Sequence, residues 1–200
     1  MGMQFSDMVF ADQVKDMNGS AIREIFHLLK VPGMISFAGG NPASSALEPD
    51  VVSEIVSEVL KRDGTAILQY GATEGYAPLR ESIAEFVKGC GLNTSADAVL
   101  PVTGSMQAMD LLCKVLINPG DAILAEDPTF LGVLQTMRMY RANIQPIATD
   151  EFGAIPESVE EQIRKFKPKL IYIIPTFQNP TGKTLILERR KQLAALASKY

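Results

Sequence analysis

Three short stretches of this 200-residue chain carry groups that could bind a phosphorylated ring. Gly104 and Ser105 lie between an apolar run and a helical pattern, so free backbone N–H groups and the positive end of a helix dipole would meet there. Phe130 offers an aromatic face and Asn179 a side-chain amide. An ordinary strand-to-helix turn is the alternative at Gly104-Ser105, because one Gly-Ser turn is a weak motif.

The pattern around these stretches predicts the elements that must position them. Four short apolar runs, each typical of a buried strand, alternate with four helical patterns. The runs occupy 99–102, 122–125, 143–148 and 170–174, and the helical patterns occupy 104–116, 131–141, 156–166 and 187–200. This alternation is typical of an α/β fold with a mainly parallel sheet flanked by helices. Ligands bind at the carboxyl ends of the strands in such sheets, so Ser105, Phe130 and Asn179 would share one crevice.

The chain ahead of residue 49 has a different pattern. An arm is followed by an amphipathic helix that begins near Ser20, and Gly39-Gly40 forms a loop in which the backbone could approach a ligand closely. Arg23 lies off the apolar stripe of that helix, where a solvated charge is the alternative to a binding role. We therefore predict two parts, residues 1–48 and residues 49–200, of which the second is the large domain.

Composition narrows the classes of function. The net charge is −4, and no run of lysine or arginine alternates with aromatic residues, which argues against a nucleic-acid partner. His27 is the single histidine, and Cys90 and Cys113 form no paired-cysteine motif, so neither a metal site nor a Ser-His-Asp triad is predicted. No apolar run reaches transmembrane length, and two unpaired cysteines fit a reducing compartment. We expect a cytoplasmic protein without a membrane partner.

Six motifs occur in a fixed order along the chain. They are Ser-Phe-Ala-Gly-Gly (36–40), Gln-Tyr-Gly with Glu-Gly-Tyr and Leu-Arg (69–80), Thr-Gly-Ser-Met-Gln-Ala (103–108), Asn-Pro-Gly-Asp (118–121), Glu-Asp-Pro-Thr-Phe (126–130) and Gln-Asn-Pro-Thr-Gly (178–182). Together they resemble the class I/II pyridoxal-phosphate-dependent aminotransferases of fold type I, and most closely the aminoadipate/kynurenine branch. The resemblance covers about residues 20–200.

The resemblance implies a set of contacts to the cofactor, pyridoxal 5'-phosphate. The backbone N–H groups that follow Gly104, those of Ser105 and Met106, would bind its phosphate, together with the Ser105 hydroxyl. The family often has glutamine in place of Met106, which matters little for a main-chain contact. Phe130 would stack on the pyridine ring, where relatives often have tyrosine. Asn179 would donate to the phenolate oxygen of the ring and help to hold the substrate carboxylate.

Other residues match positions that the family uses for the substrate. Ser20 and Arg23 resemble the mobile helix that recognises the distal end of the substrate, with Arg23 suited to a carboxylate. Gly39 and Gly40 would let the backbone close on the substrate. Tyr70 would cross from a partner subunit to the phosphate or the substrate, which implies a homodimer.

The implied reaction moves an amino group from an amino acid to a 2-oxo acid, 2-oxoglutarate in this branch, by a ping-pong mechanism. It needs a lysine that bonds to the cofactor aldehyde, an aspartate that keeps the pyridine nitrogen protonated, and an arginine for the substrate carboxylate. In relatives all three follow a strand that would begin just past Tyr200. We therefore expect no catalytic residue in these 200 residues, an incomplete large domain, and no activity from this segment alone.

Local geometry and two alternatives complete these expectations. Relatives bend sharply at the positions of Pro128 and Pro180, sometimes through a cis bond, which proline tolerates.

The first alternative function is a pyridoxal-phosphate-sensing domain of a transcription regulator, although no helix-turn-helix pattern precedes the arm. The second is a dinucleotide-binding module, which requires G-x-G-x-x-G, whereas residues 103–108 lack the second and third glycines.

Overall fold

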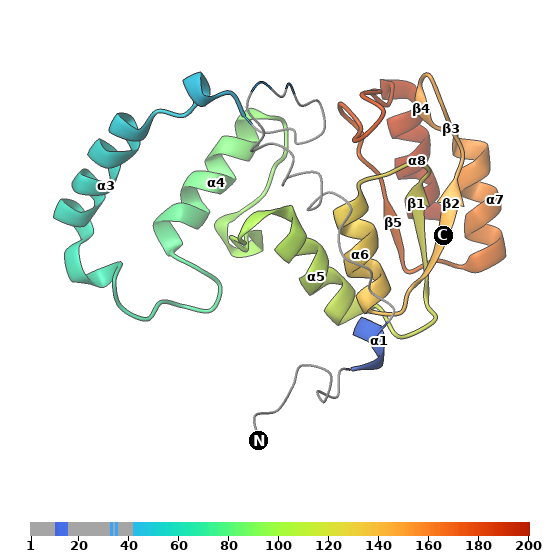
Figure 1. Ribbon diagram of the computed structural model, residues 1–200, viewed down its shortest axis with the longest axis horizontal. Helices are drawn as coiled ribbons and strands as arrows, with labels where there is room; N and C mark the ends of the chain where they lie inside the picture. The colour runs from blue at the N-terminus through green and yellow to red at the C-terminus, as the bar shows by residue number, and fades with distance from the viewer. Residues whose placement is uncertain (1–10, 16–32, 34, 36–41) are drawn as a thin grey trace. The chain divides into compact units, whose positions relative to one another are not determined.

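The computed structural model describes residues 11–15, 33, 35 and 42–200 of the chain (Figure 1). The chain divides into two compact units, one of residues 1–17 and 102–200 and the other of residues 18–101. The first unit contains the short helix α1 (Asp12–Lys15) and the whole parallel sheet. The domain boundary expected at residue 48 stays a prediction.

A parallel sheet forms the centre of the first unit. Its strands are β1 (Ala122–Glu126), β2 (Asn143–Ile147) and β5 (Leu170–Tyr172), in the order β2-β1-β5. Both pairings are parallel, so Ile123 lies between its partners Ile144 and Leu170. All five residues of β1 are buried, as expected for a central strand whose two faces are covered by helices. The α/β fold predicted from the sequence is confirmed.

Two pairs of helices cover the two faces of this sheet, because successive side chains of a strand point to opposite sides. Ile123 packs in one cluster with α5 (Gly104–Leu116) and α6 (Leu131–Met139). Leu124, the next residue, packs in another cluster with side chains of α7 (Pro156–Phe166) and α8 (Leu187–Lys199). Figure 1 shows α5 and α6 to the left of the strands and α7 to their right, while α8 overlaps the strands in this view.

A small antiparallel hairpin lies between β2 and α7. It pairs β3 (Thr149–Asp150) with β4 (Gly153–Ala154). Arg189 of α8 donates from its two terminal nitrogens to the two Asp150 carboxylate oxygens, each at 2.6 Å, and to the Gly153 carbonyl at 2.9 Å. Hydrogen bonding from Arg189 lowers the pKa of Asp150 to about 2. This contact fixes α8 against the hairpin.

Among its described residues, the second unit carries two long helices, α3 (Pro49–Asp63) and α4 (Ala77–Gly89). Each has a proline in its first turn, where the missing N–H is not needed. Three single turns of 3-10 helix accompany them: η2 (Ser44–Ala46), η3 (Gly64–Ala66) and η4 (Ala96–Ala98). Nε of Arg80 on α4 donates to the carbonyls of Ala96 and Val99, both at 3.0 Å. These bonds hold the segment that follows α4.

The strand predicted at 99–102 is wrong. Val99 has extended backbone angles, φ −108° and ψ 126°, but the segment is not part of a strand. No strand among the described residues pairs with it, and a strand forms only with a partner for its hydrogen bonds. Leu100 is correspondingly exposed rather than buried. The helix predicted after it is present as α5, beginning at Gly104.

None of the helices in the described ranges is long and apolar enough to cross a membrane.

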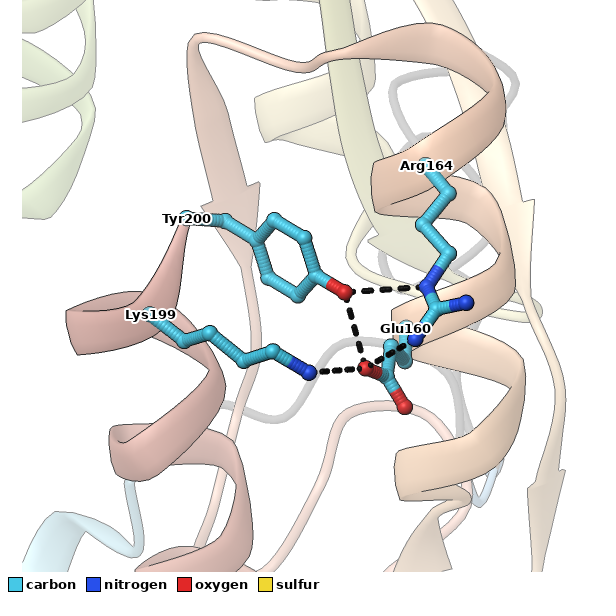
Figure 2. Close-up of polar contacts among 4 residues, drawn as sticks. All are labelled: Glu160, Arg164, Lys199 and Tyr200. Atoms are coloured by element: carbon cyan, nitrogen blue, oxygen red, sulfur yellow. Dashed lines mark hydrogen bonds and ion pairs between the residues drawn. The ribbon is translucent and has the colours of Figure 1, made fainter.

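A cluster of charged groups joins the ends of α7 and α8 (Figure 2). One Glu160 oxygen accepts hydrogen bonds from Lys199 Nζ at 2.7 Å, Arg164 at 2.8 Å and the Tyr200 hydroxyl at 2.8 Å. These bonds, that from Lys199 first, lower the pKa of Glu160 from its ordinary 4.5 to about 2. Because the folded pKa is the lower one, the stabilisation is complete above the ordinary value and is lost as pH falls from 4.5 toward 2.

We expect Glu160→Gln to lower the urea midpoint of unfolding at pH 7 and to lose this disadvantage as the pH falls from 4.5 toward 2. The measurement is urea unfolding of wild type and variant across that pH range. Glu161→Gln is the matched control, since Glu161 is exposed on the same helix and no hydrogen bond or ion pair to it occurs among the described residues. Equal midpoints for Glu160→Gln and wild type at pH 7 would contradict the expectation.

Candidate functional site

The three stretches singled out from the sequence meet in the first unit, through two direct links. Nε2 of Gln178 donates to the carbonyl of Pro128 at 2.7 Å, which joins the segment after β5 to the segment after β1. Phe130 and Met106 both lie against Gly132, since a Cβ built on Gly132 falls 2.8 Å from the Phe130 ring and 3.2 Å from the Met106 sulfur. The start of α5, the start of α6 and the loop after β5 are therefore neighbours.

The first turn of α5 presents unpaired backbone donors. Gly104 opens the helix with φ +76°, a conformation that glycine adopts without strain. Within the described ranges, no hydrogen bond reaches the N–H groups of Ser105 and Met106 or the Ser105 hydroxyl. Ser105 is exposed. Free N–H groups at the positive end of a 13-residue helix bind anions, and phosphate in particular.

Phe130 stands at the start of α6, directly after the segment that leaves β1. It is half-buried and packs against the cluster of Met109, Cys113 and Ile123. The preceding Thr129 is only 4% exposed, and its hydroxyl oxygen has no hydrogen-bond partner among the residues that the structure describes. A buried hydroxyl normally has a partner, so the unpaired hydroxyl of Thr129 is an exception at this place.

Asn179 lies in the loop that follows β5, and its side chain is exposed. Its carboxamide makes no hydrogen bond to any described residue, which leaves both donor and acceptor available. The loop itself is held at its base: Arg190 donates to the carbonyls of Pro175 and Leu185 at 2.7 and 2.8 Å, and the N–H of Leu185 donates to Pro175 at 2.9 Å. An unpaired amide is thus presented by an anchored loop.

The two sharp bends expected from the resemblance are confirmed. The peptide bonds Asp127-Pro128 and Asn179-Pro180 are both cis.

Sequence reasoning missed the buried polar residues beneath the site. Glu126, at the end of β1, is 4% exposed and Gln178 is 5% exposed. The Glu126 carboxylate accepts the N–H of Ile174 at 2.9 Å, and burial raises the pKa of Glu126 although that hydrogen bond opposes the shift. A signal for Glu126 existed in the sequence, because an acidic residue closes the otherwise apolar run of β1.

The other residues predicted to meet the substrate lie outside the first unit's described residues. Tyr70 belongs to the second unit, where its side chain is fully exposed. Ser20, Arg23, Gly39 and Gly40 lie outside the described residues. Their roles toward a substrate stay predictions.

Comparison with known proteins gives one family and a consistent set of relatives. The family Aminotransferase class I and II matches residues 32–200. Aromatic-amino-acid aminotransferase 1 of Thermococcus litoralis is 39% identical over 197 residues, which cover 96% of this chain and 47% of that protein.

Two solved structures resemble the chain closely. A kynurenine aminotransferase of Pyrococcus horikoshii, solved in complex with PMP, has a TM-score of 0.86 and 35% identity over 96% of this chain and 48% of that one. The α-aminoadipate aminotransferase of Thermus thermophilus, complexed with N-(5'-phosphopyridoxyl)-L-leucine, has a TM-score of 0.83 and 36% identity over 95% and 46%. The chain spans about half the length of the relatives it matches.

Proposed function

Since this chain belongs to the class I and II aminotransferases, we propose that it supplies the cofactor-binding part of a pyridoxal-phosphate-dependent aminotransferase. The predicted family and its aminoadipate/kynurenine branch are confirmed by the comparisons. The observation that carries the proposal is the meeting of unpaired donors at the start of α5, the ring of Phe130 and the free amide of Asn179.

The chemical types of these groups match the phosphate, the aromatic ring and the ring oxygen of the cofactor. The N–H groups of Ser105 and Met106, with the Ser105 hydroxyl, would bind the phosphate. The Phe130 ring would stack on the pyridine, and the Asn179 amide would donate to the ring oxygen. The unpartnered hydroxyl of Thr129 is a further polar group beside them. When bound, pyridoxal phosphate withdraws electrons from the bonds at the amino acid's α-carbon, and the role of these residues is to hold and orient it.

The proposed substrates are an amino acid as amino donor and a 2-oxo acid, 2-oxoglutarate, as acceptor, in a ping-pong exchange. The named activities of the relatives support this class. A homodimer in which Tyr70 reaches the neighbouring site is part of the proposal, as is Arg23 as the partner of a distal substrate carboxylate.

A cytoplasmic location is proposed because Cys90 and Cys113 are both free thiols. A pyridoxal-phosphate sensor in a transcription regulator is not favoured, since the relatives described above are aminotransferases.

The proposal predicts that the protein binds pyridoxal phosphate and that Asn179→Ala weakens binding. Losing one hydrogen bond to a charged group costs about 1.5–3 kcal/mol, so we expect a dissociation constant roughly 10- to 100-fold higher. The measurement is equilibrium dialysis followed by absorbance of the bound cofactor.

Asn93→Ala is the control, because Asn93 is exposed in the second unit and no hydrogen bond involves its side chain among the described residues. The proposal fails if wild type retains no more pyridoxal phosphate than an unrelated protein does. Amino transfer from an amino acid to 2-oxoglutarate, followed through the glutamate formed, tests the activity itself.

A further inference from the structure

We infer that Gln178 is a positioning residue, which locks the loop of Asn179 onto the loop of Phe130 and so sets where the Asn179 amide meets the cofactor ring. The inference rests on the proposed function, because it concerns the same cofactor. It assigns an indirect role to Gln178, which would not touch the cofactor but would fix the position of Asn179, which would.

Gln178 is 5% exposed, and its carboxamide uses both of its ends. Nε2 donates to the carbonyl of Pro128 at 2.7 Å, across 50 positions of sequence. Oε1 accepts from the N–H of Thr181 at 2.9 Å and from its hydroxyl at 2.7 Å. One end therefore binds the segment that leads to Phe130, and the other shapes the turn that contains Asn179.

The rest of this loop is held only at its base. Arg190 and the backbone pair of Leu185 with Pro175 close the two ends. Among the described residues, the hydrogen bonds that join residues 177–184 to another part of the chain come from the side chain of Gln178, to the Pro128 carbonyl at 2.7 Å and to the Glu126 carboxylate. Without this side chain, the loop of Asn179 keeps its internal backbone bonds but is no longer tied to the segment of Phe130.

The surroundings explain why this position takes a neutral amide. The buried carboxylate of Glu126 lies beside it and accepts the N–H of Ile174. A hydrogen bond from Gln178 lowers the pKa of Glu126 against the larger effect of burial. A carboxylate at position 178 would face both Glu126 and the carbonyl of Pro128, which costs free energy. An apolar side chain would leave the partly buried hydrogen bond to that carbonyl unmade.

The test uses Gln178→Met, which keeps the length of the side chain and removes all hydrogen bonds of the carboxamide, and Gln178→Glu, which keeps the acceptor for Thr181 and lacks the donor at neutral pH. Gln192→Met is the matched control, because Gln192 is exposed on α8 and no hydrogen bond involves its side chain in the described part of the chain. Two quantities are measured: amide hydrogen exchange of residues 176–183 in the protein without cofactor, and the dissociation constant for pyridoxal phosphate.

We expect Gln178→Met to speed exchange in this segment by about tenfold and to weaken cofactor binding by about tenfold, as losing one buried hydrogen bond implies. Combining it with Asn179→Ala should weaken binding no further than Asn179→Ala alone, because Gln178 acts through Asn179. The Gln178→Glu variant should bind pyridoxal phosphate weakly at pH 8 and regain affinity as the pH falls, because a protonated carboxyl can donate a hydrogen bond to the Pro128 carbonyl. This pH-dependent recovery tests the link even where Gln178→Met does not fold.

Unchanged exchange in both variants would overturn the inference, and so would full additivity with Asn179→Ala. Unchanged affinity of both variants for pyridoxal phosphate, with wild type binding it and Asn179→Ala weakened, would also overturn it. If wild type binds no pyridoxal phosphate, the proposed function fails instead, and the exchange data still report whether Gln178 holds the loop.

Discussion

We expect Ser105→Asp to weaken the binding of pyridoxal phosphate by roughly 100-fold or more while leaving the protein at least as stable as wild type. The two effects have opposite signs because the helix dipole and the ligand respond differently to the same charge. An aspartate in the first turn of α5 interacts favourably with the helix dipole, by about 0.3–1 kcal/mol. The same carboxylate repels a phosphate group that carries close to two negative charges at pH 7.

The expected loss is large. Two unit charges 4 Å apart interact by about 4 kcal/mol at the effective dielectric constant of a protein surface, so binding should weaken by roughly 100-fold or more. Cofactor titration gives the affinity, and thermal unfolding without cofactor gives the stability. Ser105→Asn is the control, since asparagine has the shape of aspartate without its charge. If the aspartate variant binds as well as the asparagine variant, the phosphate does not bind at the start of α5.

Gly153→Ala destabilises the protein by about 2–5 kcal/mol, the largest effect on stability that we expect from one methyl group. Gly153 is buried in β4 with φ +94°, where an L-residue is strained by about 1–2 kcal/mol. A Cβ there would lie 2.9 Å from a Leu185 methyl carbon and 3.0 Å from the Leu185 backbone Cα. The backbone contact cannot be relieved by a rotamer change, so overpacking adds about 1–3 kcal/mol.

The variant Gly120→Ala separates the cost of the backbone angle from the cost of the steric clash. Gly120 has nearly the same backbone angle, φ +91°, but nothing lies within 4 Å of a Cβ built on it. Both variants lose the same conformational freedom in the unfolded chain, so the difference between their free energies of unfolding reports the clash with Leu185 alone. Urea unfolding measures it. A deficit for Gly153→Ala no greater than that for Gly120→Ala would show that β4 and Leu185 separate easily.

Much of the first unit was predictable from local patterns. The apolar run at 122–125 predicts β1, and the run at 170–174 predicts β5, because strands buried on both faces are apolar throughout. Prolines predict helix starts well, as at Pro156 of α7. The rule that ligands bind at strand ends predicts that the segments after β1 and β5 meet, and the hydrogen bond from Gln178 to Pro128 joins them.

The remaining features depend on contacts that no local pattern reveals. Residues 99–102 have the composition of a strand, but a strand also needs a partner, and none is present among the described residues. Gln178 resembles any loop glutamine until its 50-position link to Pro128 is seen. Glu126 gave a local signal, but its role depends on Ile174, far along the chain.

The bond from Gln178 to Pro128, across those 50 positions, also bears on how the protein acquires its native structure. Contacts between segments far apart in the sequence form more slowly than local ones, and this bond requires that both segments already be in place. Under the proposed function, a partly folded chain would lack a high-affinity site, and pyridoxal phosphate would bind only the folded state. By mass action, a cofactor at about 100 times its dissociation constant would stabilise the folded state by about 2.7 kcal/mol and so raise the population of folded protein.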